Sequence, residues 1–206
     1  MRGRPLDTKK SEQQKEHLIN AAHQLLAEKS FKNITIREIA ARAAVNSAMI
    51  SYHFGGKEQL FIALVSKLAS HNLGQMNTVF SSDNPIKTLI QHMLGFVNKN
   101  RAVARFIHDE VLTQDSPLRD QFIKSVPTRI ASVLPKLIKK MQQEGKIRAD
   151  LNPTWAGFSL VSLVMMPFIV SPVREQAWGI SEQQISSPEW AEHLYQLFIS
   201  GCKRDS

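Results

Sequence analysis

The 206-residue chain has one cysteine, Cys202, and no recognisable export signal at its start. A single cysteine excludes a disulfide within the chain. The first ten residues, MRGRPLDTKK, lack the apolar run that a secretory signal needs. We therefore expect the protein to act in a reducing cytoplasm.

The chain also lacks a long, uninterrupted hydrophobic run. Residues 151–173 carry no charge, but three prolines interrupt them. The part that can be continuously helical, between Pro153 and Pro167, is shorter than the roughly 20 residues that a bilayer requires. This stretch predicts a buried core or interface helix, and we expect no membrane partner.

Catalytic and metal-binding patterns are absent from the sequence. No nucleophile elbow, phosphate loop or dinucleotide fingerprint occurs, and the seven histidines are scattered without an H-x-x-x-H pair. The one dense polar cluster is His108-Asp109-Glu110, whose adjacent side chains point in different directions on a helix. We expect a solvated face there, and no enzyme activity, catalytic residue, metal or cofactor.

Positive charge is in excess, and it is concentrated near the N-terminus. Residues 1–57 contain 10 Lys or Arg against 5 acidic residues, whereas residues 58–206 contain 16 against 13. A basic segment of this kind favours a polyanion, because each phosphate contact releases condensed counterions. An acidic membrane surface also fits the charge, so charge alone does not identify the partner.

Every convincing periodic segment has the helical period, which predicts an all-α fold. An amphipathic helix is expected from about Ser11 to residue 31. The pair Thr35 and Glu38 forms a capping box that starts a second short helix, ending near residue 42. Asn46 can cap a third helix, which runs through His53 until Gly55 and Gly56 break it, and Lys57 then opens a longer fourth helix.

A capping side chain followed by proline marks four later helix starts. These are Asn84-Pro85, Ser116-Pro117, Asn152-Pro153 and Ser187-Pro188. Gly145 follows a basic run and predicts a helix end. We expect a flexible basic arm over residues 1–10, a three-helix domain over 11–56 and a helical bundle over 57–206.

Residues 35–54 have the layout of a helix-turn-helix. The expected inner face consists of Ile36, Ile39, Ala40, Ala43, Val45 and Ile50. The outward positions of the second helix are Ser47, Ala48, Ser51 and Tyr52, with Met49 near the edge. These side chains are of a size that can enter a major groove. An ordinary helical hairpin has the same spacing, so spacing alone leaves both interpretations open.

The run from Thr35 to Leu60, which ends Y-H-F-G-G-K-E-Q-L, resembles the DNA-binding domain of the tetracycline-repressor (TetR) family. The preceding helix, with Ala21-Ala22, Leu25-Leu26 and Phe31, also follows that family's pattern. The resemblance covers about residues 11–65. It implies an N-terminal helix-turn-helix followed by a helical ligand-binding and dimerisation domain, in a transcriptional regulator that is by family habit a repressor.

The resemblance implies a role for each matching position. Phosphate contacts fall on Thr35, Tyr52, His53 and Lys57, and base-edge contacts on Ser47, Ala48 and Met49, with Asn46 at the start of the same helix. Phe54 matches a packing position. Two residues depart from the family pattern. Ala44 replaces a turn glycine and should keep negative φ or accept strain, and Ser51 replaces an aromatic residue, leaving a base contact open.

The resemblance also implies an effector pocket and a homodimer. The expected pocket residues are Phe96, Phe106, Trp155, Phe158, Met165, Met166 and Phe168, which suit a hydrophobic or amphipathic small molecule. The expected dimer helices are about 153–170 and 187–203, with Trp190, Leu194, Leu197 and Phe198 at the interface. A core role for these apolar residues, with the last helix packed on its own bundle, is the alternative.

The sequence leaves open two other classes of protein and one further DNA contact, made by the N-terminal arm. A nucleoid-type architectural protein calls for a steeper basic excess in the larger domain, and a helical-bundle enzyme calls for convergent polar groups. The arm Arg2-Gly3-Arg4-Pro5 is either a minor-groove contact or a disordered tail. A ligand-responsive DNA-binding regulator, whose partners are an operator duplex, a small effector and a second copy, is the function we predict.

Overall fold

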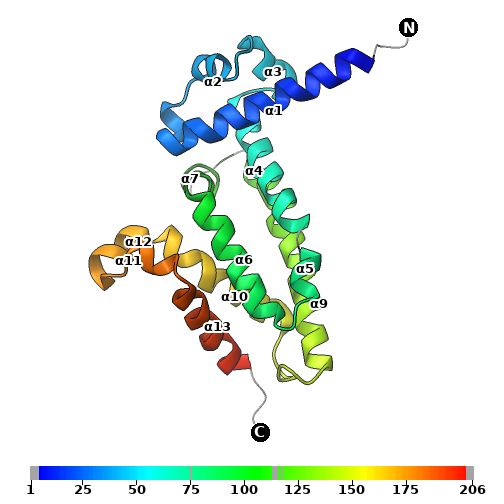
Figure 1. Ribbon diagram of the computed structural model, residues 1–206, viewed down its shortest axis with the longest axis vertical. Coiled ribbons are helices and arrows are strands. Elements are labelled where there is room, and N and C mark those ends of the chain that lie inside the picture. The colour runs from blue at the N-terminus through cyan, green and yellow to red at the C-terminus, as the bar shows by residue number, and fades with distance from the viewer. Residues whose placement is uncertain (1–4, 75, 113–115, 117, 203–206) are drawn as a thin grey trace. The chain divides into compact units, whose positions relative to one another are not determined.

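The computed structural model describes residues 5–74, 76–112, 116 and 118–202, and within this part it is helical without a strand (Figure 1). The first half contains α1 (Pro5–Glu28), a short 3-10 turn η1 (Phe31–Asn33), α2 (Ile36–Arg42), α3 (Ala48–Phe54), α4 (Lys57–Gly74), α5 (Met76–Phe80), α6 (Pro85–Lys99), α7 (Arg101–Phe106) and the π-helical turn η2 (Ile107–Leu112). The second half contains α8 (Arg119–Ser125), α9 (Pro127–Gln143), α10 (Pro153–Ile169), α11 (Ser171–Trp178), α12 (Glu182–Ile185) and α13 (Pro188–Cys202). The expected all-α fold is confirmed.

Helix starts follow the predicted capping residues. The Asn152 Oδ1 atom accepts hydrogen bonds from the backbone N–H groups of Thr154 (2.9 Å) and Trp155 (3.2 Å) at the start of α10. The side chain of Asn84 caps α6 in the same way, and the Ser187 hydroxyl accepts from the third residue of α13 at 3.2 Å. The start expected at Pro117 lies outside the described residues.

The first helix begins earlier than the sequence pattern predicts. α1 starts at Pro5, six residues before Ser11, because proline's fixed φ suits the first helical position and its missing N–H needs no partner there. Residues 5–10 of the expected arm are therefore helical. Arg2, Gly3 and Arg4 of that arm lie outside the described residues.

Contacts divide the chain into two compact units. The first unit contains residues 1–70 and 105–123, and the second contains residues 71–104 and 124–206. Most of α4, together with the segment 105–123, thus joins the first unit, beyond the boundary expected after residue 56. Three phenylalanine rings pack together in this unit. The ring centroids of Phe31 and Phe61 are 5.0 Å apart, and the Phe106 centroid lies 4.9 Å from that of Phe31 and 5.4 Å from that of Phe61.

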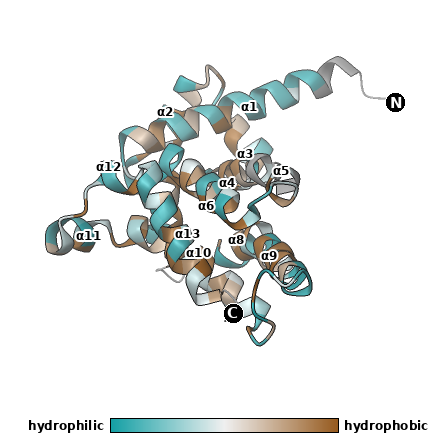
Figure 2. Cartoon of the chain, turned by 60° about the horizontal axis from the view of Figure 1, so that its bottom comes forward, coloured by the Kyte–Doolittle hydropathy of each residue, from teal (hydrophilic) through white to brown (hydrophobic). Residues whose placement is uncertain are grey.

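The second unit is built around one buried apolar cluster. α9, α10, α6 and α13 contribute Ile138, Leu160, Ile90 and Leu194, among other side chains that are nearly or fully buried. Gly157 of α10 permits close packing on α9, since a Cβ at that position would lie 3.2 Å from the Leu134 Cγ atom. In Figure 2, α10 is coloured mainly as hydrophobic, while α1 and α12 carry many hydrophilic residues.

Candidate functional site

The start of α2 is held by the predicted capping box. The Thr35 hydroxyl accepts a hydrogen bond from the Glu38 backbone N–H at 3.2 Å, and the Thr35 N–H donates to the Glu38 carboxylate at 2.9 Å. Lys29 also bonds to this carboxylate. The Lys29 ammonium, followed by the Thr35 N–H and hydroxyl, lowers the pKa of Glu38 to about 2. The helix start therefore carries a stabilised charge next to its backbone donors.

The turn between α2 and α3 closes on a strained alanine. Ala44 has φ +53°, in the left-handed region where glycine is usual. Around it the Val45 N–H donates to the Ala40 carbonyl at 3.0 Å, and the Ala44 N–H to the Ala41 carbonyl at 3.2 Å. This is the Schellman pattern of helix ends. Of the two conformations that the sequence left open for Ala44, the structure adopts the strained one.

α3 presents a row of small and aromatic side chains to solvent. Ser47, Ala48 and Ser51 are exposed, Tyr52 is 77% exposed, and Met49 is half-buried. Ile50 is fully buried and anchors the helix, so the predicted outward row is confirmed. The inner-face assignment of Ile36 is wrong, because this first residue of α2 is 36% exposed.

Both ends of α3 are fixed as the sequence predicts. The Asn46 Oδ1 atom accepts a hydrogen bond from the Ala48 N–H at 2.8 Å. At the other end Gly55 has φ +86°, which favours glycine, and its N–H donates to the Ser51 carbonyl at 2.9 Å. The exposed row of α3 is thus carried by a short, tightly bounded helix.

Lys57 is directed into its own unit. Its Nζ atom donates to the backbone carbonyls of Ile34 (2.9 Å) and Phe31 (3.1 Å) and lies 4.0 Å from the centre of the Phe31 ring. Burial lowers the pKa of Lys57. The ammonium group therefore joins the first residue of α4 to the segment that leads into α2, and two of its three hydrogens are used inside the unit.

The other residues expected at phosphates differ in how free their polar atoms are. The Thr35 hydroxyl is engaged in the capping box, and His53 is half-buried with its Nε2 atom 3.4 Å from the Gln14 Oε1 atom. Tyr52 is 77% exposed, and its side chain has no such engagement in the capping box or against α1. Phe54 is half-buried beside His53, which suits the packing role expected for it.

Arg37 is a candidate that the sequence analysis missed. It lies exposed in the first turn of α2, and within the described residues no ion pair or hydrogen bond of its side chain is recorded. Lys29 and Arg42, by contrast, pair with Glu38 and Glu28. The signal available in the sequence was the one cation in the first turn after the capping threonine. Arg37 is thus a free cation on the outer side of α2.

A second surface gathers exposed apolar side chains on the second unit. Trp155 and Phe158 of α10 are each 75% exposed, Trp178 at the end of α11 is 75% exposed, and Leu197 of α13 is 54% exposed. Three of them, Phe158, Trp178 and Leu197, line an apolar hollow of about 810 Å³, together with Met166 and Trp190. We call this surface the apolar face.

The seven expected pocket residues do not share one cavity. Phe158 and Met166 line the hollow, and Trp155 is exposed on the same helix. Met165 and Phe168 are half-buried, with Phe168 packed against the core. Phe96 is half-buried on α6, and Phe106 belongs to the ring cluster of the first unit.

The four expected dimer residues also separate. Leu194 and Phe198 are 3% and 5% exposed and belong to the core of their own bundle, because α13 packs this side on α6. Trp190 is half-buried, and Leu197 is exposed on the apolar face. One side of α13 therefore packs in the core, and another side exposes apolar side chains to solvent.

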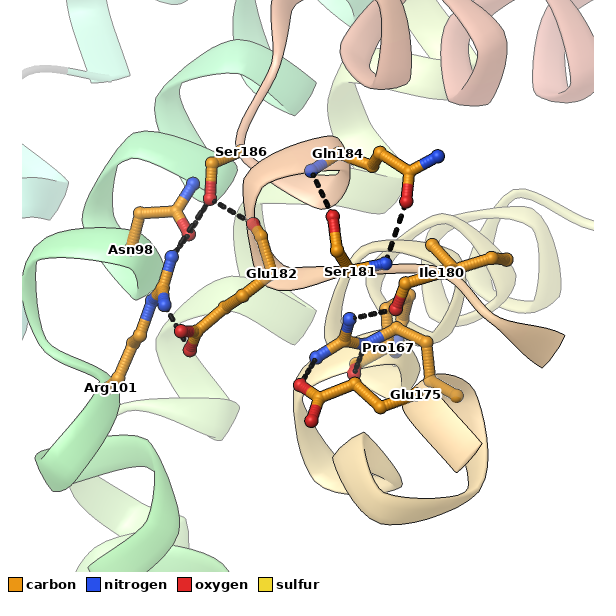
Figure 3. A network of polar contacts seen from close by, with 10 residues as sticks. Asn98, Arg101, Pro167, Glu175, Ile180, Ser181, Glu182, Gln184 and Ser186 are labelled. Atoms are coloured by element: carbon orange, nitrogen blue, oxygen red, sulfur yellow. Dashed lines mark hydrogen bonds and ion pairs between the residues drawn. The ribbon is translucent and has the colours of Figure 1, made fainter. Parts of the chain in front are cut away.

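Polar contacts hold the segment beside the hollow (Figure 3). Arg174, only 5% exposed, donates from Nε to the Pro167 carbonyl at 3.0 Å and also bonds to the Ile180 carbonyl and the Glu175 carboxylate. Arg101 pairs with Glu182 and donates to the Ser186 hydroxyl at 2.8 Å. These bonds fix α11 and α12 next to α10 and α6.

Neither a metal site nor a membrane span is evident in the described part of the chain. No group of three or more His, Cys, Asp or Glu residues there could hold a metal ion. No single described helix is long and apolar enough to cross a bilayer. α10 and α11 reach that length and hydropathy only together, across a bend of 73°.

A capped first helix, a tight turn and a second helix with a solvent-facing row define a helix-turn-helix DNA-binding domain. A sequence model described as "Bacterial regulatory proteins, tetR family" matches residues 18–64, which include all of this motif. The N-terminal domain of the chain is thus a DNA-binding domain of the tetR family of bacterial regulatory proteins.

Relatives match nearly the full length of the chain. The "Probable HTH-type transcriptional regulator YttP" of Bacillus subtilis is 29% identical over 195 residues, which is 92% of this chain and 90% of that protein. The "Nucleoid occlusion factor SlmA" of Shewanella pealeana is 23% identical over 186 residues, 83% of this chain and 94% of that one.

Solved structures share the fold. The transcriptional regulator FadR from Bacillus subtilis, crystallised with stearoyl-CoA, superposes with a TM-score of 0.75 at 18% identity, covering 90% of this chain and 98% of its own. A TetR/AcrR-family regulator from Thermobifida fusca gives 0.69 at 19% identity, covering 92% and 98%. Their similarity shows that this chain shares their all-helical fold.

Proposed function

We propose that this regulator is a dimeric repressor, which reads two DNA half-sites with α3 and leaves its operator when a hydrophobic small molecule binds the second unit. The observation that carries the proposal is the exposed row Ser47, Ala48, Ser51 and Tyr52 on a helix capped at both ends. A rigid helix with small outward side chains fits a major groove roughly 12 Å wide.

Roles within this surface follow from the exposure of each side chain. Ser47, Ala48, Met49 and Ser51 read base edges, and Asn46 holds the start of the reading helix. Tyr52 and Arg37 are the main phosphate contacts, since they are exposed. Thr35 and His53 support them, because the Thr35 hydroxyl is engaged in the capping box and His53 is half-buried. Lys57 contributes its charge and its remaining N–H to a nearby phosphate while it holds the Phe31 and Ile34 carbonyls.

A second copy of the chain covers the apolar face in this proposal. Six large apolar side chains on α10, α11 and α13 are 48 to 75% exposed, more than a monomer in water usually gathers on one surface. Two half-sites also require two readers related by symmetry. Leu197, Trp190, Phe158 and Trp155 form the contact, while Leu194 and Phe198 support it from the core.

The effector is a hydrophobic or amphipathic compound. The hollow of about 810 Å³ is lined almost wholly by apolar groups, including Phe158 and Met166 from the expected pocket. A structural neighbour with the same fold was crystallised with stearoyl-CoA, which has a long acyl chain. Because the hollow lies on the apolar face, an effector there also changes the surface that the second copy covers.

Native mass spectrometry of the purified protein tests the effector proposal. A dimer carrying a co-purified lipid-like compound is expected, and adding that compound should release the protein from DNA selected by it. A ligand-free dimer whose DNA binding does not respond to a series of fatty acids and their CoA thioesters would contradict this part of the proposal.

The relation to SlmA supports one alternative function, which is nucleoid-associated binding at many chromosomal sites. The two functions differ in genome-wide occupancy. Chromatin immunoprecipitation should give a few promoter sites for the repressor, and many dispersed sites for the alternative.

A further inference from the structure

We propose that the outer face of α9 is a second, sequence-independent binding surface for duplex DNA, separate from the helix-turn-helix. Four cations lie exposed on this helix, Arg129, Lys136, Lys139 and Lys140. We call them the α9 basic face. The proposal goes beyond the repressor function, because that function requires no DNA contact from the second unit.

No acidic residue within α9 itself offsets the charge of this face. From residue 121 to residue 143 the chain has five Lys or Arg and no Asp or Glu. Ordinary solvent-facing helices mix both signs. Lys140 is 3.8 Å from the Glu144 carboxylate, which Lys146 contacts more closely at 2.8 Å. Among the described residues no ion pair or hydrogen bond is recorded for Lys136 or Lys139.

The cations share one side of the helix. At about 100° per residue, Arg129, Lys136 and Lys140 fall within about 40° of one another, and Lys139 lies about 60° further round. The buried residues Leu134, Leu137, Ile138 and Met141 occupy the opposite side, packed in the core. Over 11 residues the row extends about 16 Å along α9. A repeating row of phosphates matches such a row of cations.

Duplex DNA fits this surface better than a membrane does. A helix that lies in a membrane interface inserts an apolar side next to its cations. The apolar side of α9 is buried, so this helix has nothing to insert. The protein also carries a tetR-type DNA-binding domain, so duplex DNA is a ligand that it already binds.

The test measures binding of the full-length protein to a random-sequence 60-base-pair duplex by fluorescence anisotropy from 50 to 300 mM salt. In the triple variant Lys136→Gln, Lys139→Gln, Lys140→Gln, the slope of log affinity against log salt should fall by about two to three, since each phosphate contact contributes about 0.9. The matched variant with three Lys→Arg changes should keep the slope, and so should Lys99→Gln on α6.

Circular dichroism and thermal unfolding should be unchanged in all variants, because the substituted side chains are exposed. The DNA sequence selected by the triple variant should equal that of the wild type, which separates this proposal from the function of α3. An unchanged salt slope in the triple variant would overturn the proposal. So would loss of binding to vesicles of anionic phospholipid with DNA binding intact.

Discussion

At the scale of single residues, the backbone of Ala44 is strained, as the replacement of a turn glycine by alanine allowed. Its φ of +53° is a conformation that costs an L-residue about 1–2 kcal/mol. The end of α9 shows the relaxed equivalent, where Gly145 has φ +71° and the Lys146 N–H donates to the Met141 carbonyl at 2.9 Å. The same hydrogen-bond pattern is thus built once with alanine and once with glycine.

We predict that Ala44→Gly stabilises the protein by about 0.5–1 kcal/mol, because relief of strain exceeds the extra entropy of glycine in the unfolded chain. Chemical denaturation measures the change, with Ala41→Gly in the helical part of α2 as the control that should destabilise. A loss of stability in Ala44→Gly would show that this turn does not need a left-handed residue.

Lys57 combines a packing role with the phosphate role that family resemblance implies. We predict that Lys57→Met lowers the free energy of unfolding by about 1–2 kcal/mol, since two hydrogen bonds and a ring contact of a half-exposed ammonium are lost. It should also flatten the salt dependence of DNA binding by about one unit of log–log slope.

Thermal unfolding and anisotropy titrations measure the two effects of Lys57→Met separately. Arg37→Ala is the matched control, because Arg37 is exposed and its loss should change the salt slope but not the stability. Unchanged stability in Lys57→Met would refute the packing role, and an unchanged slope would refute the phosphate contact.

At the scale of elements, the capping box makes the start of α2 sensitive to acid. The pKa of Glu38 is about 2 in the folded protein and near 4.5 otherwise, so its ionised form stabilises the fold. This contribution is complete above pH 4.5 and is lost as the pH falls through about 2. We predict that Glu38→Gln destabilises the protein at pH 7 and has little effect at pH 2.

Urea unfolding at several pH values measures the Glu38 effect. Glu58→Gln is a suitable control, because Glu58 is an exposed carboxylate near the start of α4. A constant stability difference between wild type and Glu38→Gln across the whole range would contradict the assignment of this carboxylate.

Elements were predictable from sequence where a local signal fixes them. Three helices are capped by Asn84, Asn152 and Ser187, which bond to residues two or three positions along the chain. Both partners of each capping bond are therefore visible in a short stretch of sequence. The early start of α1 has no such signal beyond Pro5. The contacts of Lys57 depend on carbonyls 23 and 26 residues away, which no local pattern shows.

At the scale of the whole molecule, periodicity identified apolar stripes but not what covers each side. The stripe on α13 was expected at a dimer interface, yet Leu194 and Phe198 lie in the core while Leu197 is exposed. A helix can carry apolar side chains on two sides, and only the tertiary packing decides which side is buried in the core. For the same reason, Phe106 belongs to the ring cluster of the first unit and not to a pocket.

Because Leu194 is buried in the core and Leu197 is exposed, dimerisation is best tested by substituting exposed residues. We predict that Phe158→Asp with Leu197→Asp gives a folded monomer, because both side chains are exposed and a charge buried in a dimer interface costs several kcal/mol. Leu112→Asp, also at an exposed leucine, is the control that should stay dimeric. Sedimentation at micromolar concentration measures the state, and a wild-type monomer would contradict the proposed dimer.

The claim that α3 reads DNA sequence is tested most directly by selection of binding sites from random DNA. The wild type should enrich one sequence of two symmetric half-sites, and Ser47→Ala, Ala48→Ser and Ser51→Ala should each change the bases enriched within a half-site. Each lost base contact should cost about 1–3 kcal/mol. Enrichment of the same sequence by the wild type and all three variants, or of no sequence by any of them, would contradict the account.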